Sequence, residues 1–257
     1  MIEVSGLRKE FVLTAKQRKE LNTKEHIATA VDGISFKCEP GRVFSLLGPN
    51  GAGKTTTLRM LSTIFKPTSG SIHICGIDAI ASPKEARMKI GFLTGSTGLY
   101  ARLTPVEMIN YFADLYGVEK TVREERKERL FNLLDMNDFL HKRIGKLSTG
   151  MKQKVSICRT MIHDPEVVIF DEPTSGLDVI TAENIIQLIR DCKNEGKTVI
   201  FSSHIMSEVD LLCDDIAIVH KGKLLMQSTM DEFRSKMTSD SLTQEFINIV
   251  HQSNTTL

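Results

Sequence analysis

A glycine-rich segment, Gly48-Pro-Asn-Gly-Ala-Gly-Lys-Thr55, lies between an apolar run and a helical pattern. Its spacing, G-x-x-x-x-G-K-[ST], is that of a phosphate-binding loop. The glycines let backbone N–H groups turn inward toward phosphate oxygens, and the following helix adds the positive end of its dipole. The segment therefore predicts an α/β fold in which a strand, this loop and a helix hold a nucleotide.

The side chains of the loop have separate expected roles. We expect Lys54 to neutralise the β- and γ-phosphates of ATP, and the Thr55 hydroxyl to ligate Mg²⁺. The expected nucleotide-binding residues of this stretch are Gly48, Pro49, Asn50, Gly51, Ala52, Gly53, Lys54, Thr55 and Thr56.

A second apolar run, Val167-Val-Ile-Phe170, is followed by Asp171 and Glu172. A run that is apolar at every position predicts a strand covered on both faces. Its carboxyl end lies where open α/β sheets bind ligands. We expect Asp171 to bind Mg²⁺ through water, and Glu172 to orient and deprotonate the attacking water. An acidic pair after a strand is often only a helix cap, but behind a phosphate loop it predicts hydrolysis.

Short apolar runs alternate with helical patterns along most of the chain, which predicts a largely parallel sheet. Further strands are expected at Val43–Leu47, Thr198–Phe201 and Asp215–Val219. A helix after the phosphate loop is expected to place Leu58, Leu61, Ile64 and Phe65 on one face. Another helix is expected to bury Ile185, Leu188, Ile189 and Cys192, and to end at Gly196.

The middle of the chain has no strand pattern from Thr104 to Leu140. One helix is expected to start at Thr104-Pro105 and a second to span Arg123–Leu134, which together predict an inserted helical subdomain over about residues 94–160. Residues 1–257 then form one domain, with a short extension over about 223–257. That extension is expected to hold a strand, a helix around Met230–Met237, and a small apolar group at Phe246, Ile247 and Val250.

Segment Val12–Thr29 has mixed charge and weak periodicity, which is typical of a solvated hairpin or a mobile loop. A partner-docking role is the alternative. The five cysteines are odd in number and contain no C-x-x-C pair, so free thiols in a reducing cytosol are expected.

Composition excludes several classes of protein. The 33 Lys and Arg balance 32 Asp and Glu, which argues against a nucleic-acid partner. No apolar run approaches the ~18 residues of a membrane span. The first residues, MIEVSGLRKEF, lack the apolar core of a signal peptide, which argues against secretion.

Four further motifs, together with the phosphate loop, resemble the ATP-binding cassette (ABC) family from Met1 to about Gly222. Residues 147–151 resemble its signature and residues 175–178 its D-loop. His204, directly after a strand pattern, resembles its switch histidine, and Phe11 falls where the family stacks an aromatic ring on adenine. The matched residues are Leu147, Ser148, Thr149, Gly150 and Met151 in the signature, and Ser175, Gly176, Leu177 and Asp178 in the D-loop.

The resemblance implies a P-loop NTPase core with a mostly parallel sheet, an antiparallel β subdomain and an inserted α-helical subdomain. It implies an ATPase with Lys54, Glu172 and His204 as its catalytic residues. In this family the signature of one cassette closes over the ATP held by the phosphate loop of another. Two copies, expected to be a homodimer, would therefore meet head to tail with two ATPs between them.

The sequence departs from the family pattern at three positions. In the run Ile90-Gly-Phe-Leu-Thr-Gly95, Gly95 stands where the family has a glutamine at the end of a strand, so Thr94, Ser96 or water would take its place at the metal. Thr149 replaces a common glycine of the signature, and Met151 a common glutamine. The phosphate contacts expected of Ser148 and Gly150 are retained.

The resemblance further implies the ATPase subunit of a membrane transporter, peripheral at the cytoplasmic face and acting on a separate polytopic membrane subunit. The runs Phe92–Thr104 and Ala30–Phe36, with the expanded segment after Phe11, resemble the NatA-like sodium-efflux branch. The first alternative is a non-transport cassette acting on ribosomes, DNA or iron–sulfur assembly. A phosphate-loop kinase is disfavoured by the signature and D-loop, and a regulator without hydrolysis by Glu172.

Overall fold

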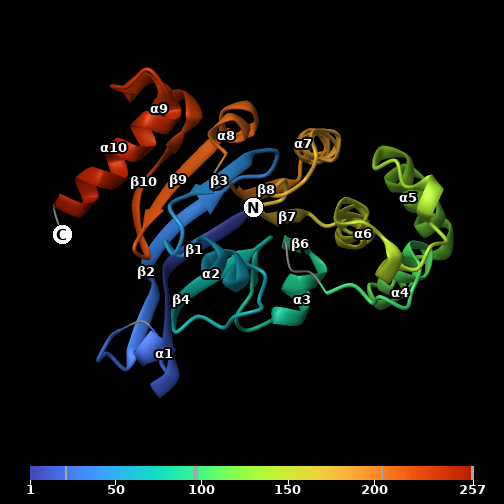
Figure 1. Cartoon of the computed structure of the whole chain (residues 1–257), viewed down its shortest axis with the longest axis horizontal. Coiled ribbons are helices and arrows are strands. Elements are labelled where there is room, and N and C mark those ends of the chain that lie inside the picture. The colour runs from blue at the N-terminus through green and yellow to red at the C-terminus, as the bar shows by residue number, and fades with distance from the viewer. Residues whose placement is uncertain (21, 95–97, 204, 256–257) are drawn as a thin grey trace.

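Two β-sheets and the helices around them make up the computed structural model, which describes residues 1–20, 22–94, 98–203 and 205–255 (Figure 1). The six-stranded sheet has the order β10-β9-β3-β8-β7-β6 and the four-stranded sheet the order β2-β1-β4-β5. The strands of the larger sheet are β3 (Val43–Leu47), β6 (Ile90–Thr94), β7 (Val167–Asp171), β8 (Thr198–Ser202), β9 (Asp215–His220) and β10 (Lys223–Thr229). Those of the smaller sheet are β1 (Ile2–Val12), β2 (Ile27–Cys38), β4 (Ser69–Ile74) and β5 (Ile77–Asp78).

The helices lie between and around these strands. They are α1 (Ala15–Glu20), α2 (Lys54–Leu61), α3 (Pro83–Met88), α4 (Pro105–Leu115), α5 (Lys120–Leu133), α6 (Thr149–Met161), α7 (Val179–Asn194), α8 (Met206–Leu212), α9 (Met230–Lys236) and α10 (Leu242–Thr255). Two short 3₁₀ turns, Asn137–Phe139 and Ile144–Lys146, precede α6.

The larger sheet is largely parallel, as the sequence predicts. β3 pairs in parallel with β8 and β9, and β7 pairs in parallel with β6 and β8. β10 runs antiparallel to β9 at one edge. The carboxyl ends of the parallel strands therefore meet along one edge, where the loops after β3 and β7 lie together.

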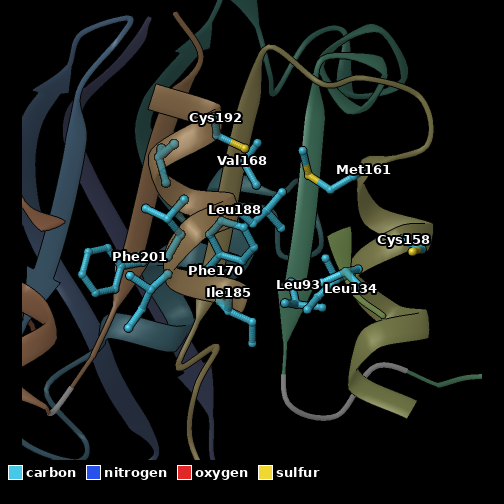
Figure 2. Packing of buried hydrophobic residues seen from close by; sticks show 14 of the residues in the cluster. Leu93, Leu134, Cys158, Met161, Val168, Phe170, Ile185, Leu188, Cys192 and Phe201 are labelled. Atoms are coloured by element: carbon cyan, nitrogen blue, oxygen red, sulfur yellow. The ribbon is translucent and has the colours of Figure 1, made fainter. Parts of the chain in front are cut away.

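Side chains of the parallel strands alternate between two cores. Val43 and Leu47 of β3 belong to one cluster of buried residues, while Phe44 and Leu46 belong to the other. The first cluster packs against α7 and α8, and Figure 2 shows side chains of β7 and of α7 filling this layer. The second cluster packs against α2 and the antiparallel sheet. Burial on both faces explains why these strands read as continuous apolar runs.

Helices α4, α5 and α6 follow one another between β6 and β7, at the end of the molecule away from α10 (Figure 1). α4 begins as predicted, because Thr104 and Glu107 form a reciprocal capping box with Pro105 in the first turn. α5 begins at Lys120, three residues before the predicted start at Arg123.

The prediction that Ile64 and Phe65 extend the helix after the phosphate loop is wrong. α2 ends at Leu61, and Thr63 adopts a left-handed backbone with φ 57°. The backbone N–H groups of Ile64 and Phe65 both donate to the carbonyl of Arg59, at 2.9 and 3.1 Å. This turn leads the chain away from the helix axis, and the Ile64 side chain is 56% exposed.

Two segments, one near each end of the chain, adopt structures that the sequence patterns did not decide. β1 and β2 pair out to Val12 opposite Ile27, and α1 lies in the connection, so the segment over residues 12–29 is the hairpin alternative. The expected apolar group at Phe246, Ile247 and Val250 lies on a helix, α10, that the sequence reading did not assign.

Candidate functional site

The phosphate loop connects β3 to α2, in the context that its motif requires. Gly53 has φ 106°, and a Cβ there would lie 2.5 Å from the carbonyl oxygen of Ala30. A Cβ on Gly48 would lie 2.3 Å from the carbonyl oxygen of Val219 on the neighbouring strand β9. Both approaches are too close for any side chain, so these glycines are needed for the loop to fit between β2 and β9.

Lys54 is 6% exposed and turns back over the loop that precedes it. Its Nζ donates to the carbonyl oxygens of Gly48 and Pro49, at 2.6 and 3.2 Å. Burial lowers the pKa of Lys54, while the carboxylates of Glu172 and Asp171 act to raise it. The ammonium group is thus held at the centre of the loop, facing the acidic end of β7.

Asp171, at the end of β7, accepts two hydroxyl hydrogen bonds on one oxygen. Thr55 Oγ1 donates to Asp171 Oδ1 at 3.2 Å, and Ser202 Oγ donates to the same oxygen at 2.8 Å. The structure therefore brings together the two residues that the sequence predicts as metal ligands. Sequence reasoning missed Ser202, for which the only signal is a serine at the end of β8.

Glu172 has a left-handed backbone, with φ 51°, immediately after β7. Its N–H donates to both the carbonyl oxygen and the hydroxyl of Ser202, at 3.1 and 3.2 Å. Its side chain lines a cavity of about 330 Å³ together with Lys54, Thr55 and other loop residues. A non-glycine residue held in this backbone region is uncommon, and such strain concentrates at functional sites.

The signature segment forms the start of α6. Ser148 is the N-cap of this helix, and its hydroxyl accepts from the Met151 N–H at 3.2 Å. Ser148 and Thr149 are exposed, whereas Leu147 is buried in the core. Among the described residues that line the 330 Å³ cavity, none comes from 147–151.

The D-loop lies against the signature within the same chain. A Cβ on Gly150 would lie 3.5 Å from Asp178 Oδ2, and Gln153 Nε2 donates to the carbonyl of Pro173 at 3.3 Å. Asp178 caps α7 by accepting from the N–H and hydroxyl of Thr181, and these bonds hold the pKa of the Asp178 carboxyl below its usual value. The two motifs are therefore joined at one surface.

Glu208 is a second residue that sequence reasoning missed. Its buried carboxylate accepts from Thr174 Oγ1 at 2.6 Å and from Ser203 Oγ at 2.9 Å. It thereby ties the D-loop side of the site to the end of β8. His204 and Gly95, which the sequence analysis singled out, lie outside the described residues.

Phe11 lies near the end of β1 and is not among the described residues that line the loop cavity. Its ring meets the Phe65 ring edge-on, with centroids 5.7 Å apart, and Lys9 Nζ lies 5.0 Å from its centroid. The structure therefore places an aromatic pair at this end of the antiparallel sheet.

With this geometry in place, the comparison with known proteins identifies the family. A profile described as ABC transporter matches residues 31–175, more than half of the chain. The chain belongs to the ABC transporter family. It is 39% identical over 230 residues to the ABC transporter ATP-binding protein NatA of Bacillus subtilis, which covers 89% of this chain and 94% of that protein.

Solved ABC structures share the fold. The structure of the ATP-binding subunit of an ABC transporter matches 97% of this chain and 99% of its own, with a TM-score of 0.85 and 26% identity. A dimeric ATP-binding cassette in a post-hydrolysis state, bound to ADP and Pi, matches 90% of this chain and 99% of its own, with a TM-score of 0.78 and 24% identity.

This ABC protein is an ATP-binding subunit that hydrolyses ATP. The predicted fold is confirmed, with its parallel core, antiparallel sheet and inserted helices. Within the described residues, no helix is both long and apolar enough to cross a membrane.

Proposed function

We propose that this ABC ATPase works at the cytoplasmic face of a membrane and powers export through a separate polytopic subunit. A groove of about 260 Å³ between the core and the inserted helices is the observation that carries this proposal. The groove is lined from α3 and β6 on one side and from α4 and α6 on the other. Four exposed apolar residues line the groove or adjoin its lining in sequence, namely Ile64 in the lining, Met88 after Arg87, and Tyr111 and Leu115 before Phe112 and Tyr116.

The groove is connected through the sheet to the strand end at which the nucleotide is expected to bind. Its floor includes Gly91 and Phe92 of β6, the strand that pairs with β7 and its terminal Asp171. We propose that a helical unit over about residues 94–160 shifts relative to the core when the nucleotide changes. A segment held between the two walls of the groove would then be moved by this shift of the helical unit.

We further propose that about residues 223–257 are a short extension of the core.

ATP binding uses the residues around the loop cavity. We propose that the triphosphate lies over residues 48–56, with backbone N–H groups and Lys54 Nζ donating to its oxygens. Phe11 would stack on the adenine. Glu172 would orient the attacking water and accept its proton, because Glu172 and Lys54 line the same cavity.

The oxygen atoms at the end of β7 suit Mg²⁺. Thr55 Oγ1 and Asp171 Oδ1 already lie within hydrogen-bond distance, and Mg²⁺ prefers one or two protein oxygens together with waters and substrate phosphates. When bound, the ion would neutralise charge on the β- and γ-phosphates. Ser202 would hold Asp171 in place through the hydroxyl bond on the same oxygen.

Substitutions in the loop and at β7 should separate nucleotide affinity from metal dependence. Lys54→Ala should weaken ATP binding at least about ten-fold, because it removes a charge-assisted donor to the phosphates. Asp171→Asn should bind ATP normally without Mg²⁺ but lose most of the gain that Mg²⁺ gives. The measurement is ATP affinity with and without Mg²⁺, with exposed Lys236→Ala on α9 as control. Identical profiles for the two site variants would contradict these roles.

The second half of each ATP site would come from another copy of the chain. Ser148 and Thr149 are exposed and contribute nothing to the described lining of their own loop cavity. We propose a head-to-tail homodimer in which Ser148 and Gly150 donate to the γ-phosphate held by the partner's loop, with residues 175–178 beside them and His204 on the same phosphate. ATP would favour the closed dimer because it contacts both copies only there.

Isolation from native membranes tests the transport proposal. The tagged chain, recovered with mild detergent, should bring down a polytopic membrane protein in fixed ratio, and that pair should hydrolyse ATP in liposomes. Cargo is tested by ATP-dependent Na⁺ movement in the same liposomes, with K⁺ as the comparison ion. Recovery with ribosomal or DNA-bound proteins, and no polytopic protein, would overturn the transport proposal.

A further inference from the structure

A guanidinium group lies half-buried in the groove, and none of the described residues accepts a hydrogen bond from it. Arg159 extends from α6, and its Cζ lies 5.1 Å from the centroid of the Phe112 ring. Within the part of the chain that the structure describes, Arg159 makes no ion pair and donates no hydrogen bond. Burial lowers the pKa of the Arg159 guanidinium, so the folded chain bears a desolvation cost that no described carboxylate offsets.

Two acidic residues that lie close in sequence to groove-lining residues are engaged elsewhere. Asp114 of α4 pairs with Arg123 at 2.8 Å, and Asp164 pairs with Lys197 at 2.6 Å and with Arg126 at 3.0 Å. None of these acidic groups lines the groove.

The described groove lining carries positive charge only. It contains a second arginine, Arg87 of α3, which donates to Thr63 Oγ1 at 3.0 Å and is exposed at the mouth. His163 adds no charge at neutral pH, because burial lowers its pKa to about 4. Its ring stacks on Tyr116 with centroids 3.7 Å apart, and its Nε2 lies 3.1 Å from the carbonyl oxygen of Ile90.

A carboxylate on an apolar segment is the ligand that this surface suits. A guanidinium presents its donors in a planar fork that matches the two oxygens of a carboxylate. The surrounding wall is aromatic and aliphatic, with Phe112 and Tyr116 inside and Tyr111 and Leu115 exposed beside it. An amphipathic protein segment can satisfy both the apolar wall and the guanidinium, since it supplies apolar side chains for the wall and one carboxylate for Arg159.

We propose that the segment of the membrane subunit that enters this groove presents an Asp or Glu carboxylate to Arg159, with Arg87 as the second cation at the mouth. This inference rests on the transport function proposed above, and it adds the chemistry by which the partner is recognised. Arg159 would thus select for an acidic docking segment.

A lysine substitution can locate the carboxylate directly. In the complex isolated from native membranes, Arg159→Lys keeps a cation in the groove and supplies an amine that a carbodiimide couples to a contacting carboxylate. Mass spectrometry should find the α6 peptide joined to an Asp or Glu of the membrane subunit. The control is Arg190→Lys on α7, where Glu183 of the same chain lies at 4.0 Å and should be the coupling partner.

Affinity supplies the second readout. Arg159→Met, which retains the aliphatic bulk, should weaken binding of the purified membrane subunit about 30-fold or more, because the partner's carboxylate is left buried and unpaired. Arg190→Met should change that affinity less than about two-fold, as expected of a rim or surface charge. Thermal unfolding of the isolated Arg159→Met chain should occur at or above the temperature of the parent, because relief of the desolvation cost of the guanidinium offsets the lost contact with the Phe112 ring.

The other outcomes of these experiments distinguish failure of the carboxylate inference from failure of the transport proposal. Coupling within the chain or to a second copy, or no coupling at Arg159 while the Arg190 control couples, would overturn the carboxylate inference and leave transport standing. So would an equal loss of binding to protein-free vesicles containing phosphatidylglycerol, because the ligand would then be a lipid phosphate. If no polytopic protein accompanies the chain, the transport proposal fails and this inference fails with it.

Discussion

Glu172→Gln is expected to bind ATP as the parent does and to hydrolyse it roughly 10²-fold more slowly or worse, because an amide cannot take the proton of the attacking water. The substitution is nearly isosteric, so the backbone bonds from Glu172 N–H to Ser202 should survive. The ATP-bound dimer should then accumulate, since the step that removes its bridging phosphate is blocked. Phosphate release, ATP affinity and size-exclusion chromatography in ATP measure the three effects.

A matched control separates this effect from a general loss of negative charge. Glu183→Gln changes an exposed carboxylate on α7 to the same amide, and its turnover should stay within about two-fold of the parent. Parental turnover by Glu172→Gln would remove Glu172 from the proposed chemistry. Weak ATP binding with normal turnover at saturation would reassign it to nucleotide binding.

The sequence predicts those parts of the site whose residues lie within a single local sequence pattern. The loop Gly48–Thr55 carries its own geometry, because Gly48 and Gly53 allow backbone approaches that a Cβ would block. Asp171 could be placed because an all-apolar strand precedes it and the parallel sheet aligns its end with the loop. Thr55 and Asp171 then meet at 3.2 Å, as those two local patterns together imply.

Other parts depend on tertiary packing that no local pattern records. Ser202 and Glu208 are ordinary residues in the sequence, yet each bridges segments that are distant along the chain. The end of α2 was mispredicted because Ile64 continues the helical spacing while the backbone turns at Thr63. The exposed Ile64 instead lines the groove, so a residue whose spacing predicts a helix lies at a proposed partner surface.

The contact between signature and D-loop has a consequence for how two copies would communicate. Gly150 packs beside Asp178, and Gln153 Nε2 donates a hydrogen bond to the carbonyl oxygen of Pro173, in the loop that follows Glu172. The surface that we propose a chain offers to its partner's ATP is thus tied to the loop that carries Glu172, the proposed water-positioning residue. Val179 and Ile180, 85% and 75% exposed, extend this surface and would be buried by a second copy.

Mixing two inactive variants is expected to restore activity if each ATP is shared between copies. Lys54→Ala should fail through its loop and Ser148→Arg through its signature, because the exposed Ser148 would carry a bulky cation into the interface. In a heterodimer both lesions fall on one site and the other site is intact. Equal mixing makes half of the dimers heterodimers, each with one intact site of two, so about a quarter of parental activity should return if one site turns over alone.

A second mixture, Lys54→Ala with Asp171→Asn, is the matched control. Both lesions lie in the loop half of the site, so every dimer has two defective sites and no activity should return. Thermal unfolding must show that Ser148→Arg is folded, because loss of the N-cap bond to Met151 costs about 1 kcal/mol.

Concentration provides an independent check on the shared site. If the active form is a dimer in equilibrium with monomers, specific activity of the parent should rise with protein concentration until the dimer saturates. A loop that works within its own chain predicts flat specific activity, no recovery in either mixture and a monomer in ATP. Recovery in the Lys54–Ser148 mixture alone fits only a site divided between two chains, because the two mixtures share the Lys54 lesion and differ only in which half of the site carries the other.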